Sequence, residues 1–394
     1  MTHWLTADEV MGRLGLKPQT LYAYVSRGRI EARPDQADAR RSLYRAADVA
    51  RLEQRKARGR RQAAVAEAAI AWGEPVLASS ITTVAHGKLW YRGLDAEALA
   101  ETARLEDVAR LLWACGDQRF PTQTTSIAPG RPHDRMFQAL AARAAVSPAL
   151  RGRRPEALYF EAAALLDLLV DAVAGGPGQG PIHDRLGQAW GCGAAGADLI
   201  RRALVLLADH ELNASTFAAR VTASTGASLA ACALAGLAAL SGPLHGGMAV
   251  RVQAFADETR RVGPQAAVAA RLAMGAGAPG FGHPLYPEGD PRARGLLSAF
   301  QPPDDQAHLA RVVREVTGEI PNIDFALTAL AERLGLPPDA PFQIFAIARC
   351  AGWIAHALEQ AKTGALIRPR ARYVGVEPGA ATPDLMDFAE GAHP

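Results

Sequence analysis

Stretches of Ala, Leu and Val at helical spacing, interrupted by Gly or Pro, dominate the chain from residue 63 onward. Three clear examples are LAETARLEDVARLLWACG, EAAALLDLLVDAVAGG and FQIFAIARCAGWIAHALEQAKTG. Apolar residues recurring three and four positions apart predict helices that pack on other helices, and Gly and Pro mark the turns between them. The β-branched, turn-bounded composition of a short hairpin is found in ASSITTVAHGKLWYRG, residues 78–93. We therefore predict a mainly α body.

Length and composition are those of a globular protein with two or three domains. The chain has 394 residues, of which 49% are hydrophobic and 21% charged. No apolar run reaches the roughly 18 residues that a membrane span needs, and the first residues lack the hydrophobic core of a signal peptide. We expect a cytoplasmic protein without a membrane partner.

Several common kinds of functional site are not indicated by the sequence. The cysteines show no metal-ligand spacing and lie in apolar surroundings, and no histidine pair has metalloprotease spacing, so we expect no metal site. No serine stands in a G-x-S-x-G setting, which disfavours a covalent acyl-enzyme. We find no phosphate-binding Walker loop and no dinucleotide fingerprint.

Positive charge is concentrated at the N-terminus. Residues 1–61 carry 14 Lys or Arg against 7 Asp or Glu, whereas the rest of the chain carries 29 against 33. Such an asymmetry suggests that one end of the chain meets a polyanion. We place a first domain at residues 1–61.

This N-terminal segment has helix-turn-helix spacing. Thr6 and Glu9 form a capping-box pattern for a first helix, Gly15 falls in the turn, and a second helix begins at residues 17–20. The stretch ARPDQADARRSLYRAADV then predicts a hairpin wing. Side chains on and after the second helix are the candidates for DNA contact: Gln19, Thr20, Tyr22, Arg27 and Arg29.

The spacing of Ala-x-Glu-Val, Leu-Gly and Thr-Leu-Tyr in this segment resembles the winged helix-turn-helix of the MerR and excisionase families. The resemblance covers about 60 residues and implies DNA binding. A helical module that docks on the main body or on a partner chain, serving assembly alone, is the alternative.

Four stretches of the body place imidazole or charged groups beside glycines, prolines or helix ends. They are DHELNASTF with His210, SGPLHGGMA with His245, GAPGFGHPLYPEGDPRA with His283 and Arg292, and PNIDF with Asp324. Glycine lets a ligand approach the backbone closely, and proline fixes the direction of the chain. A carboxylate, imidazoles and arginines together suit the removal of a proton beside a carbonyl and the attack of the resulting carbon nucleophile on a carboxylate-bearing substrate.

The last three of these stretches, followed by ARCAGWIAHALEQ and IRPRARYVG, resemble the citrate synthase family in order and approximate spacing. EPVLASSIT and LWYRGLDAEALA add weaker matches, so that the resemblance runs from about residue 73 to residue 375. The resemblance implies a two-domain, all-helical body behind the winged helix-turn-helix. We place the large domain at residues 62–246, a small lid domain at 247–335, and the return of the large domain with a C-terminal tail at 336–394.

The resemblance also implies a role for each matching residue. Asp324 is expected to be the general base, His245 to hold the thioester oxygen of the enol, and His283 to donate to the ketone oxygen of oxaloacetate. Four residues are expected to bind the substrate carboxylates: His210, Arg292, Arg349 and Arg368.

A coenzyme A thioester is implied as co-substrate, and no permanently bound cofactor is expected. The adenine end of the coenzyme is expected to meet the backbone of Pro279, Gly280, Phe281 and Gly282. In the family the residue matching Arg368 comes from the neighbouring subunit, so the resemblance implies a homodimer with shared sites.

We therefore predict an acyltransferase that condenses an acyl-coenzyme A with oxaloacetate. Residues 247–250 and 326–328 depart from the family's usual sequence after His245 and Asp324, and acetyl- and propionyl-coenzyme A both stay open as donors, giving citrate or 2-methylcitrate. The alternative function is a DNA-binding transcription regulator whose body senses a tricarboxylate or an acyl-coenzyme A.

Overall fold

Two units make up the chain, residues 1–78 and residues 79–394. A computed structural model describes residues 4–16, 18–26, 29–35, 38, 41–50, 52–53, 77–117, 119–120, 127–371 and 373–374. The boundary predicted after residue 61, with the basic stretch around it, lies outside the described residues.

The N-terminal unit combines helices with a small sheet, and its elements fall where the sequence predicts them. Beyond the elements named below, residues 46–50 and 52–53 are helical. Thr6 and Glu9 form the capping box of the first helix: the Thr6 N–H donates to Glu9 Oε2 (2.7 Å), and the Glu9 N–H donates to Thr6 Oγ1 (3.4 Å). Gly15 ends that helix in the left-handed region, with φ 58°. The elements are β1 (Trp4–Leu5), α1 (Ala7–Leu14), α2 (Pro18–Ser26), β2 (Ala32–Pro34) and β3 (Ser42–Arg45).

The three strands pair antiparallel in the order β1-β3-β2, so that β2 and β3 form the predicted hairpin. The unit has a hydrophobic core of its own, drawn from α1, α2, the sheet and the helical residues 46–50. The buried residues of this core are Leu5, Val10, Leu14, Leu21, Ile30, Tyr44 and Val49.

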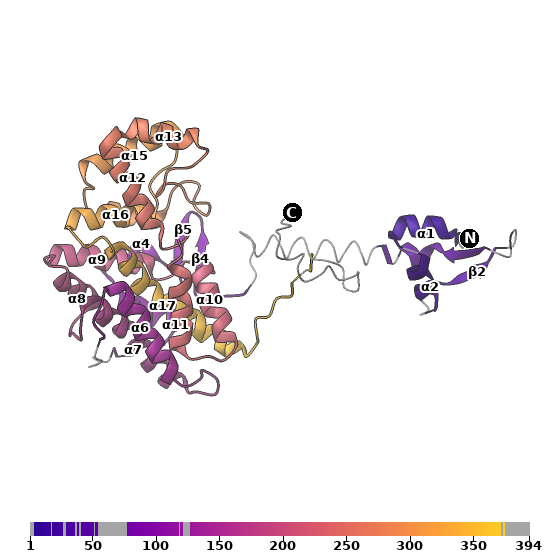
Figure 1. Cartoon of the computed structure of the whole chain (residues 1–394). Helices are drawn as coiled ribbons and strands as arrows, with labels where there is room; N and C mark the ends of the chain where they lie inside the picture. The colour runs from indigo at the N-terminus through magenta and orange to yellow at the C-terminus, as the bar shows by residue number, and fades with distance from the viewer. Residues whose placement is uncertain are drawn as a thin grey trace, which may run out of the picture. The chain divides into compact units, whose positions relative to one another are not determined.

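The second unit opens with a three-stranded antiparallel sheet and is otherwise helical (Figure 1). The hairpin predicted at residues 78–93 is confirmed as β4 (Thr82–Ala85) and β5 (Lys88–Tyr91), to which β6 (Leu94–Asp95) adds. The mainly α body is confirmed as well. Its helices are α4 (Ala96–Thr102), α5 (Leu105–Trp113), α6 (Pro132–Val146), α7 (Pro155–Ala174), α8 (Ile182–Ala189), α9 (Ala194–Leu207), α10 (Ala214–Ser224), α11 (Leu229–Leu240), α12 (Met248–Val262), α13 (Pro264–Ala273), α14 (Pro291–Leu297), α15 (Asp304–Thr317), α16 (Ile323–Leu334) and α17 (Ala340–Thr363).

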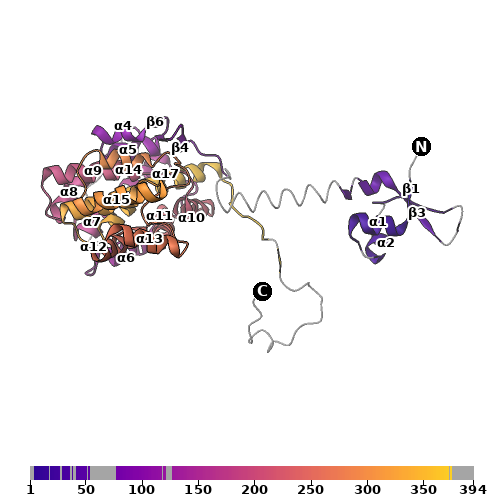
Figure 2. The ribbon, with the colours of Figure 1, turned by 90° about the horizontal axis from the view of Figure 1, so that it is seen from above.

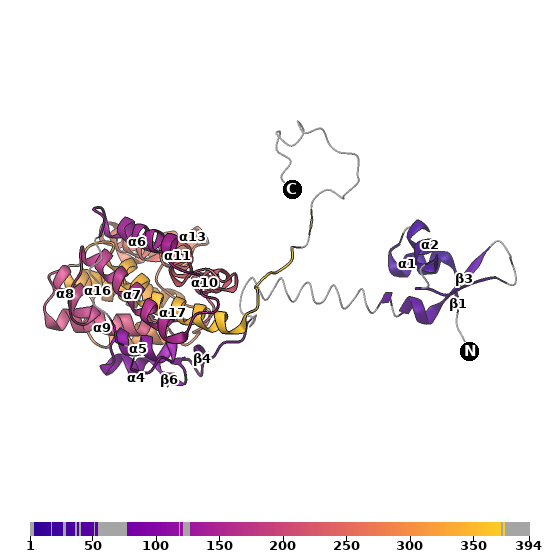
Figure 3. The same ribbon diagram turned by 90° about the horizontal axis from the view of Figure 1, so that it is seen from below.

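Helix α17 runs through the middle of this unit and packs against α5, α7, α9, α10 and α11 (Figures 1 and 3). Its residues are buried almost without interruption from Ala340 to Leu358, as expected for a helix that is apolar on all sides. Two polar side chains on it, Arg349 and His356, are equally buried. Although α17 has 24 residues, no helix of the described segments is long and apolar enough to cross a membrane.

A second hydrophobic core is formed by α12, α13, α15 and α16, which gather at one end of the unit (Figures 1 and 2). Helix α16 contributes to both cores, because Ala326 and Leu327 pack into the large one while Phe325 and Ala329 pack into the second. The N-terminus of α16 therefore lies between the two cores, and Asp324 is its second residue.

Gly236 of α11 is a sensitive point in the large core. A Cβ atom there would lie 2.5 Å from Cδ2 of Trp353, whose buried indole N–H donates to Ser215 Oγ (3.0 Å). Because the indole is held in place, we expect Gly236→Ala to lower the free energy of unfolding by about 1–3 kcal/mol. Denaturant unfolding should show this loss, whereas Gly176→Ala, where nothing lies within 4 Å of the added Cβ, should leave stability unchanged. Equal stability of the two variants would contradict the packing described here.

Candidate active site

The glycine-rich loop before α14 is joined by hydrogen bonds to the segment before α16. The Gly282 N–H donates to the Ile320 carbonyl (3.0 Å), and the Asn322 N–H donates to the Gly280 carbonyl (2.8 Å). The Asn322 side-chain amide also donates to the Gly282 carbonyl (3.0 Å). This pairing brings His283 and Asp324, which are far apart in the sequence, to one place.

The residues predicted to meet the coenzyme lie in this pairing. Pro279, Gly280 and Phe281 are buried, and the Phe281 ring packs on Phe325, with centroids 5.0 Å apart. Gly280 has φ +87°, and a Cβ on it would lie 3.0 Å from a Val252 methyl and 3.1 Å from Phe325 Cβ. The positive φ of Gly280 and the close packing of Val252 and Phe325 are therefore enough to require glycine at this position. Contact of this loop with the coenzyme stays a prediction.

Asp324 is held at the start of α16 by Asn322, whose side-chain oxygen accepts from the N–H groups of Asp324 (3.0 Å) and Phe325 (3.4 Å). The Oδ1 atom of Asp324 is buried and has no hydrogen-bond partner among the described residues. Burial raises the pKa of this carboxyl to about 6, and Asp290 adds to the rise, while Arg292 and Arg349 oppose it. A buried carboxylate oxygen without a partner is costly and is a frequent mark of a functional site.

His210 and His283 lie edge to face, with ring centroids 5.3 Å apart and an angle of 87° between the rings. His210 Nε2 is 2.8 Å from the Tyr286 hydroxyl. His283 Nδ1 accepts from the Leu285 N–H (3.2 Å). The neutral ring of His283 therefore carries its proton on Nε2, which makes Nε2 a hydrogen-bond donor.

Ser215 and Asn213 position His245. The His245 Nε2 atom is 2.9 Å from Ser215 Oγ and 3.2 Å from Asn213 Oδ1. Ser215 Oγ accepts from the Trp353 N–H (3.0 Å) and donates to Asn213 Oδ1 (2.7 Å). Hydrogen bonds thus connect His245 to Ser215 on α10 and, through Ser215, to Trp353 on α17.

Both catalytic histidine candidates are neutral at neutral pH. Burial, with the positive charges of Arg349 and Arg292, lowers the pKa of His245 to about 4. Burial and Arg292 lower the pKa of His283 to about 4 as well. The pKa of His210 lies well below its usual range, because the ring is buried and faces Arg292 and Arg349. Neutral imidazoles can donate a hydrogen bond without adding positive charge.

Asp290 fixes Arg292 and also reaches α16. The Arg292 guanidinium donates through Nε to Asp290 Oδ1 (2.9 Å) and through Nη2 to Oδ2 (2.8 Å). The same Oδ2 accepts from the Ile323 N–H (3.0 Å), at the first residue of α16. The guanidinium lies over the Tyr286 ring, 5.7 Å from its centroid. One carboxylate thus orients Arg292 and ties α14 to α16.

Arg349 brings a second buried positive charge to the site from α17. Its Nε donates to the Leu207 carbonyl (2.9 Å), and its guanidinium lies 4.8 Å from the centroid of the Phe345 ring. Nη2 is buried and has no hydrogen-bond partner in the described part of the chain. Burial lowers the pKa of Arg349 to about 10, which still leaves it charged at neutral pH. A buried guanidinium with a free donor suits an anionic ligand.

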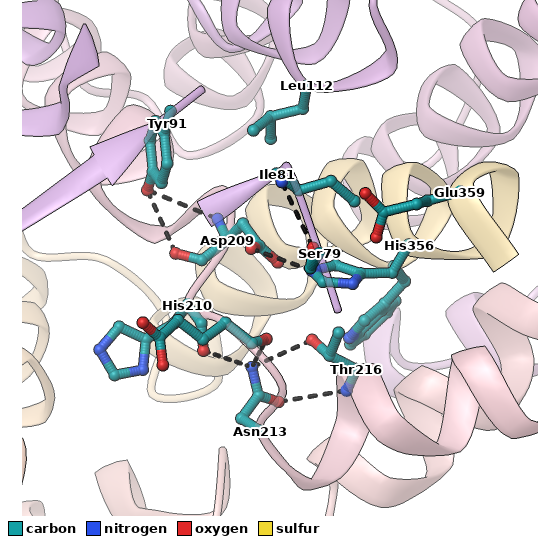
Figure 4. A network of polar contacts seen from close by, with 12 residues as sticks. Ser79, Ile81, Tyr91, Leu112, Asp209, His210, Asn213, Thr216, His356 and Glu359 are labelled. Carbon is teal, nitrogen blue, oxygen red and sulfur yellow. Dashed lines mark hydrogen bonds and ion pairs between the residues drawn. The ribbon is translucent and has the colours of Figure 1, made fainter. Parts of the chain in front are cut away.

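A buried network fixes the backbone on either side of His210 (Figure 4). On one side, Asp209 Oδ2 lies 3.3 Å from His356 Nε2, and its carbonyl accepts from the Tyr91 hydroxyl (3.3 Å). On the other side, Glu211 adopts φ 51°, a strained value for a non-glycine residue, and its carboxylate accepts from the Val84 N–H (2.6 Å). Such strain often accompanies functional sites.

The structure thus brings together six of the seven residues predicted for catalysis and substrate binding. Their contacts and mutual electrostatic effects join them in one site. Arg368 differs, because it lies in the segment after α17 and its side chain is exposed. The six residues are His210, His245, His283, Arg292, Asp324 and Arg349.

The positions of Tyr286, Asp290 and Ser215 in the site were not predicted. Tyr286 and Asp290 stand inside the quoted loop motif, and Ser215 follows His210 by five residues. Their closeness in the sequence to the predicted site residues was the one indication of a role in the site. The sequence does not show which of these side chains point into the site. Within the described residues, no group of three or more His, Cys, Asp or Glu side chains is arranged to hold a metal ion.

Two of the residues predicted to contact DNA can be located. Thr20 is half-buried on α2, and Arg29 is exposed beyond the end of that helix, 5.6 Å from the centroid of the Tyr24 ring. Arg27 and the side chains of Gln19 and Tyr22 lie outside the described residues.

Known proteins of one family match the C-terminal half of the chain. Residues 180–370 match the model of the citrate synthase C-terminal domain. A citrate synthase of Haloferax volcanii is 39% identical over 191 residues, which are 45% of this chain and 50% of that protein. The 2-methylcitrate synthase 1 of Corynebacterium glutamicum is 36% identical over 200 residues, 47% of this chain and 52% of that protein. The chain spans about half the length of the curated relatives it matches.

Solved structures extend the likeness. The citrate synthase of Thermotoga maritima superposes with a TM-score of 0.64 at 26% identity, covering 82% of this chain and 98% of that one. The citrate synthase of Thermoplasma acidophilum, solved with carboxymethyl coenzyme A and oxaloacetate, has a TM-score of 0.65 at 23% identity, covering 79% and 96%, and shows the fold alone. The helical unit has the fold of the citrate synthases. The sequence comparisons and the structural comparisons thus both relate residues 180–370 to the C-terminal domain of citrate synthases.

The raised pKa of Asp324 predicts a pH-dependent stability. The ordinary pKa of an aspartate is 3.8 and that of the folded Asp324 is about 6, so its favourable contribution is complete below pH 3.8 and is lost as the pH rises through 6. We expect Asp324→Asn to raise the free energy of unfolding at pH 8 by up to about 3 kcal/mol and to change it little at pH 4. Denaturant unfolding at both pH values measures this.

Glu315→Gln is the matched control, because it removes an exposed carboxylate from α15. It should leave stability nearly unchanged at both pH values. An Asp324→Asn variant no more stable than the wild type at pH 8 would mean that the carboxylate is solvated or paired in the folded protein.

Proposed function

We propose that the protein is a citrate or 2-methylcitrate synthase, which condenses acetyl- or propionyl-coenzyme A with oxaloacetate and releases coenzyme A. The observation that carries this proposal is the buried, unpartnered Oδ1 atom of Asp324, which shares a site with two buried guanidinium groups and three neutral imidazoles. The names of the related proteins support both products.

Asp324 is the general base of the proposed reaction. It takes a proton from the carbon beside the thioester carbonyl, which leaves an enolate. A carboxyl with a pKa of about 6 is mostly ionised at neutral pH and is more basic than an ordinary aspartate. General-base catalysis is most efficient when the pKa of the base lies near the working pH, because the base is then both ionised and strong enough to take the proton.

His245 stabilises the developing charge on the thioester oxygen. This role requires a proton on Nδ1, and the Ser215 hydroxyl can then donate to Nε2 across 2.9 Å once it gives up its bond to Asn213 Oδ1 (2.7 Å). A neutral donor held in place by protein groups needs no reorganisation as charge appears on the oxygen.

His283 donates its Nε2 proton toward the ketone oxygen of oxaloacetate while the enolate carbon attacks the ketone carbon. The new carbon–carbon bond gives a citryl thioester, and water then cleaves its carbon–sulfur bond to release citrate and the coenzyme thiol. Propionyl-coenzyme A gives 2-methylcitrate by the same steps.

Carboxylate recognition falls to the buried positive charges. Arg349 offers its free Nη2, Arg292 is pre-oriented by Asp290, and His210 is pre-oriented by Tyr286. A homodimer is part of the proposal, with Arg368 supplied by the neighbouring subunit. A protein that only senses these ligands needs the cationic groups but no base. The Asp324 Oδ1 atom without a hydrogen-bond partner therefore favours an enzyme over a sensor.

A moving small domain is also part of the proposal. Residues 247–335 close over the large domain and exclude water, and the loop at 279–282 meets the adenine end of the coenzyme. The second core of α12, α13, α15 and α16 supports such a unit, since it gives these helices their own packing. The start of α16, with Asp324, lies where the two cores meet.

The activity is tested by release of free thiol from acetyl- or propionyl-coenzyme A in the presence of oxaloacetate. We expect turnover by the wild type with at least one donor, falling as the pH drops through about 6, where Asp324 takes up a proton. Asp324→Asn should lower kcat by about 10²–10⁴-fold, the usual contribution of a general base. Oxaloacetate binding, measured by calorimetry, should survive in this variant, and Glu315→Gln should behave as the wild type.

A wild-type protein that releases no thiol with either donor would refute the proposed activity. An Asp324→Asn variant with full kcat would leave the synthase proposal standing but remove Asp324 as the base.

We further propose that the N-terminal unit is a winged helix-turn-helix that binds DNA. The order of α1, a left-handed turn at Gly15, α2 and the β2–β3 hairpin supports the fold. The exposed cations Arg29 and Arg33, together with the net positive charge of residues 1–61, support contact with a polyanion.

Fluorescence anisotropy of the full chain with labelled mixed-sequence duplex DNA tests this proposal. We expect binding at 50 mM salt that weakens at least tenfold at 200 mM, because phosphate contacts release counterions. Arg29→Gln should weaken binding, and Arg311→Gln, which removes an exposed cation from α15, should not. Absence of binding at 50 mM salt would leave the unit as an assembly or docking module.

A further inference from the structure

A cavity of about 260 Å³ lies away from the candidate active site, where the start of α7, the end of α10 and the end of α17 meet. Its lining contains none of the residues proposed for catalysis or for substrate binding. Helix α17 packs against both other helices, so the cavity belongs to the framework of the large core.

Part of the cavity lining is apolar, although Ser224, Thr225 and Gln360 also line it. Leu150, Leu158 and Leu358 line it and are only 2%, 7% and 5% exposed, and Tyr159 completes this wall. An engineered, wholly apolar cavity of about 150 Å³ holds a benzene ring. The present cavity therefore has room for one ring and a small polar group.

Three positively charged side chains lie in the lining beside the apolar part. Arg151, Arg153 and Lys362 line the cavity, and its lining includes no Asp or Glu. Arg153 is paired with Glu161, whereas Arg151 and Lys362 are exposed and have no ion pair within the described segments. Two uncompensated cations beside an apolar wall suit an anionic group held at the mouth.

Hydrogen bonds hold the walls of the cavity in place. The Gln360 amide donates to Thr363 Oγ1 (3.0 Å) and to the Ala365 carbonyl (2.9 Å), and its oxygen accepts from Arg220 Nε (2.9 Å). The Leu150 N–H donates to the Gly226 carbonyl (3.0 Å). A cavity whose wall groups are already satisfied loses little entropy when a ligand binds.

We propose that this cavity binds a small amphipathic anion, with its apolar part against the three leucines and its anionic oxygens beside Arg151 and Lys362. The proposal does not depend on the proposed function. The ligand class follows from the lining: a compact ring or short aliphatic group that carries a phosphate or carboxylate.

Phenyl phosphate is a suitable probe, and titration calorimetry of the full chain measures its binding. We expect saturable binding to the wild type, and at least tenfold weaker binding of phenol and of inorganic phosphate, because each supplies half of the interaction. The double variant R151Q/K362Q should lose at least tenfold in affinity. The matched control R311Q/R333Q removes two exposed cations elsewhere and should bind as the wild type does.

Equal binding of phenyl phosphate to the wild type and to R151Q/K362Q would overturn the proposal, because the ligand would then sit elsewhere, for example at the buried arginines of the candidate active site. Absence of saturable binding to the wild type at millimolar probe would overturn it as well. Thermal unfolding shows whether R151Q/K362Q is folded, and Lys362→Arg, which keeps the charge, should retain affinity.

Discussion

The candidate site depends on the hydrogen-bonded junction between the glycine-rich loop and the start of α16. Backbone pairing of residues 280–282 with 320–322 sets His283 beside the first turn of that helix. Asp290 adds a second tie, because one carboxylate orients Arg292 and accepts from the Ile323 N–H. Loss of this junction would separate the base, the proton donor and a carboxylate-binding group at once, since all three rest on it.

Two buried guanidinium groups set the electrostatics around this junction. Burial and the charges of Arg292 and Arg349 keep the nearby imidazoles neutral, so that they can act as hydrogen-bond donors at neutral pH. The same charges limit the pKa of Asp324 to about 6, although burial alone would raise it further. An ionised, unpaired carboxylate lowers the free energy of unfolding of the ligand-free protein. Such a loss of stability is expected at a residue that catalysis requires.

Periodicity and capping rules predicted the local structure correctly because they depend on neighbouring residues. The capping box at Thr6 and Glu9, the turn at Gly15 and the hairpin at residues 78–93 are of this kind. The roles of Tyr286 and Ser215 could not be read in the same way. Each acts through a partner more than 25 positions away in the chain, His210 or His245, and only packing determines such a pairing.

The sequence by itself determined the helical body, the basic N-terminal unit and the residue types available for chemistry, since helix periodicity, charge and side-chain identity are local properties. Tertiary structure decided how Arg349 on a buried helix, Asp324 at a helix start and His245 in a turn come together, which helix periodicity and side-chain identity do not determine. It also decided that Gly280 lies in the core and leaves little space above its Cα. The physical reason is that burial and mutual electrostatics, which set the pKa values and leave donors unpaired, arise only when distant segments pack together.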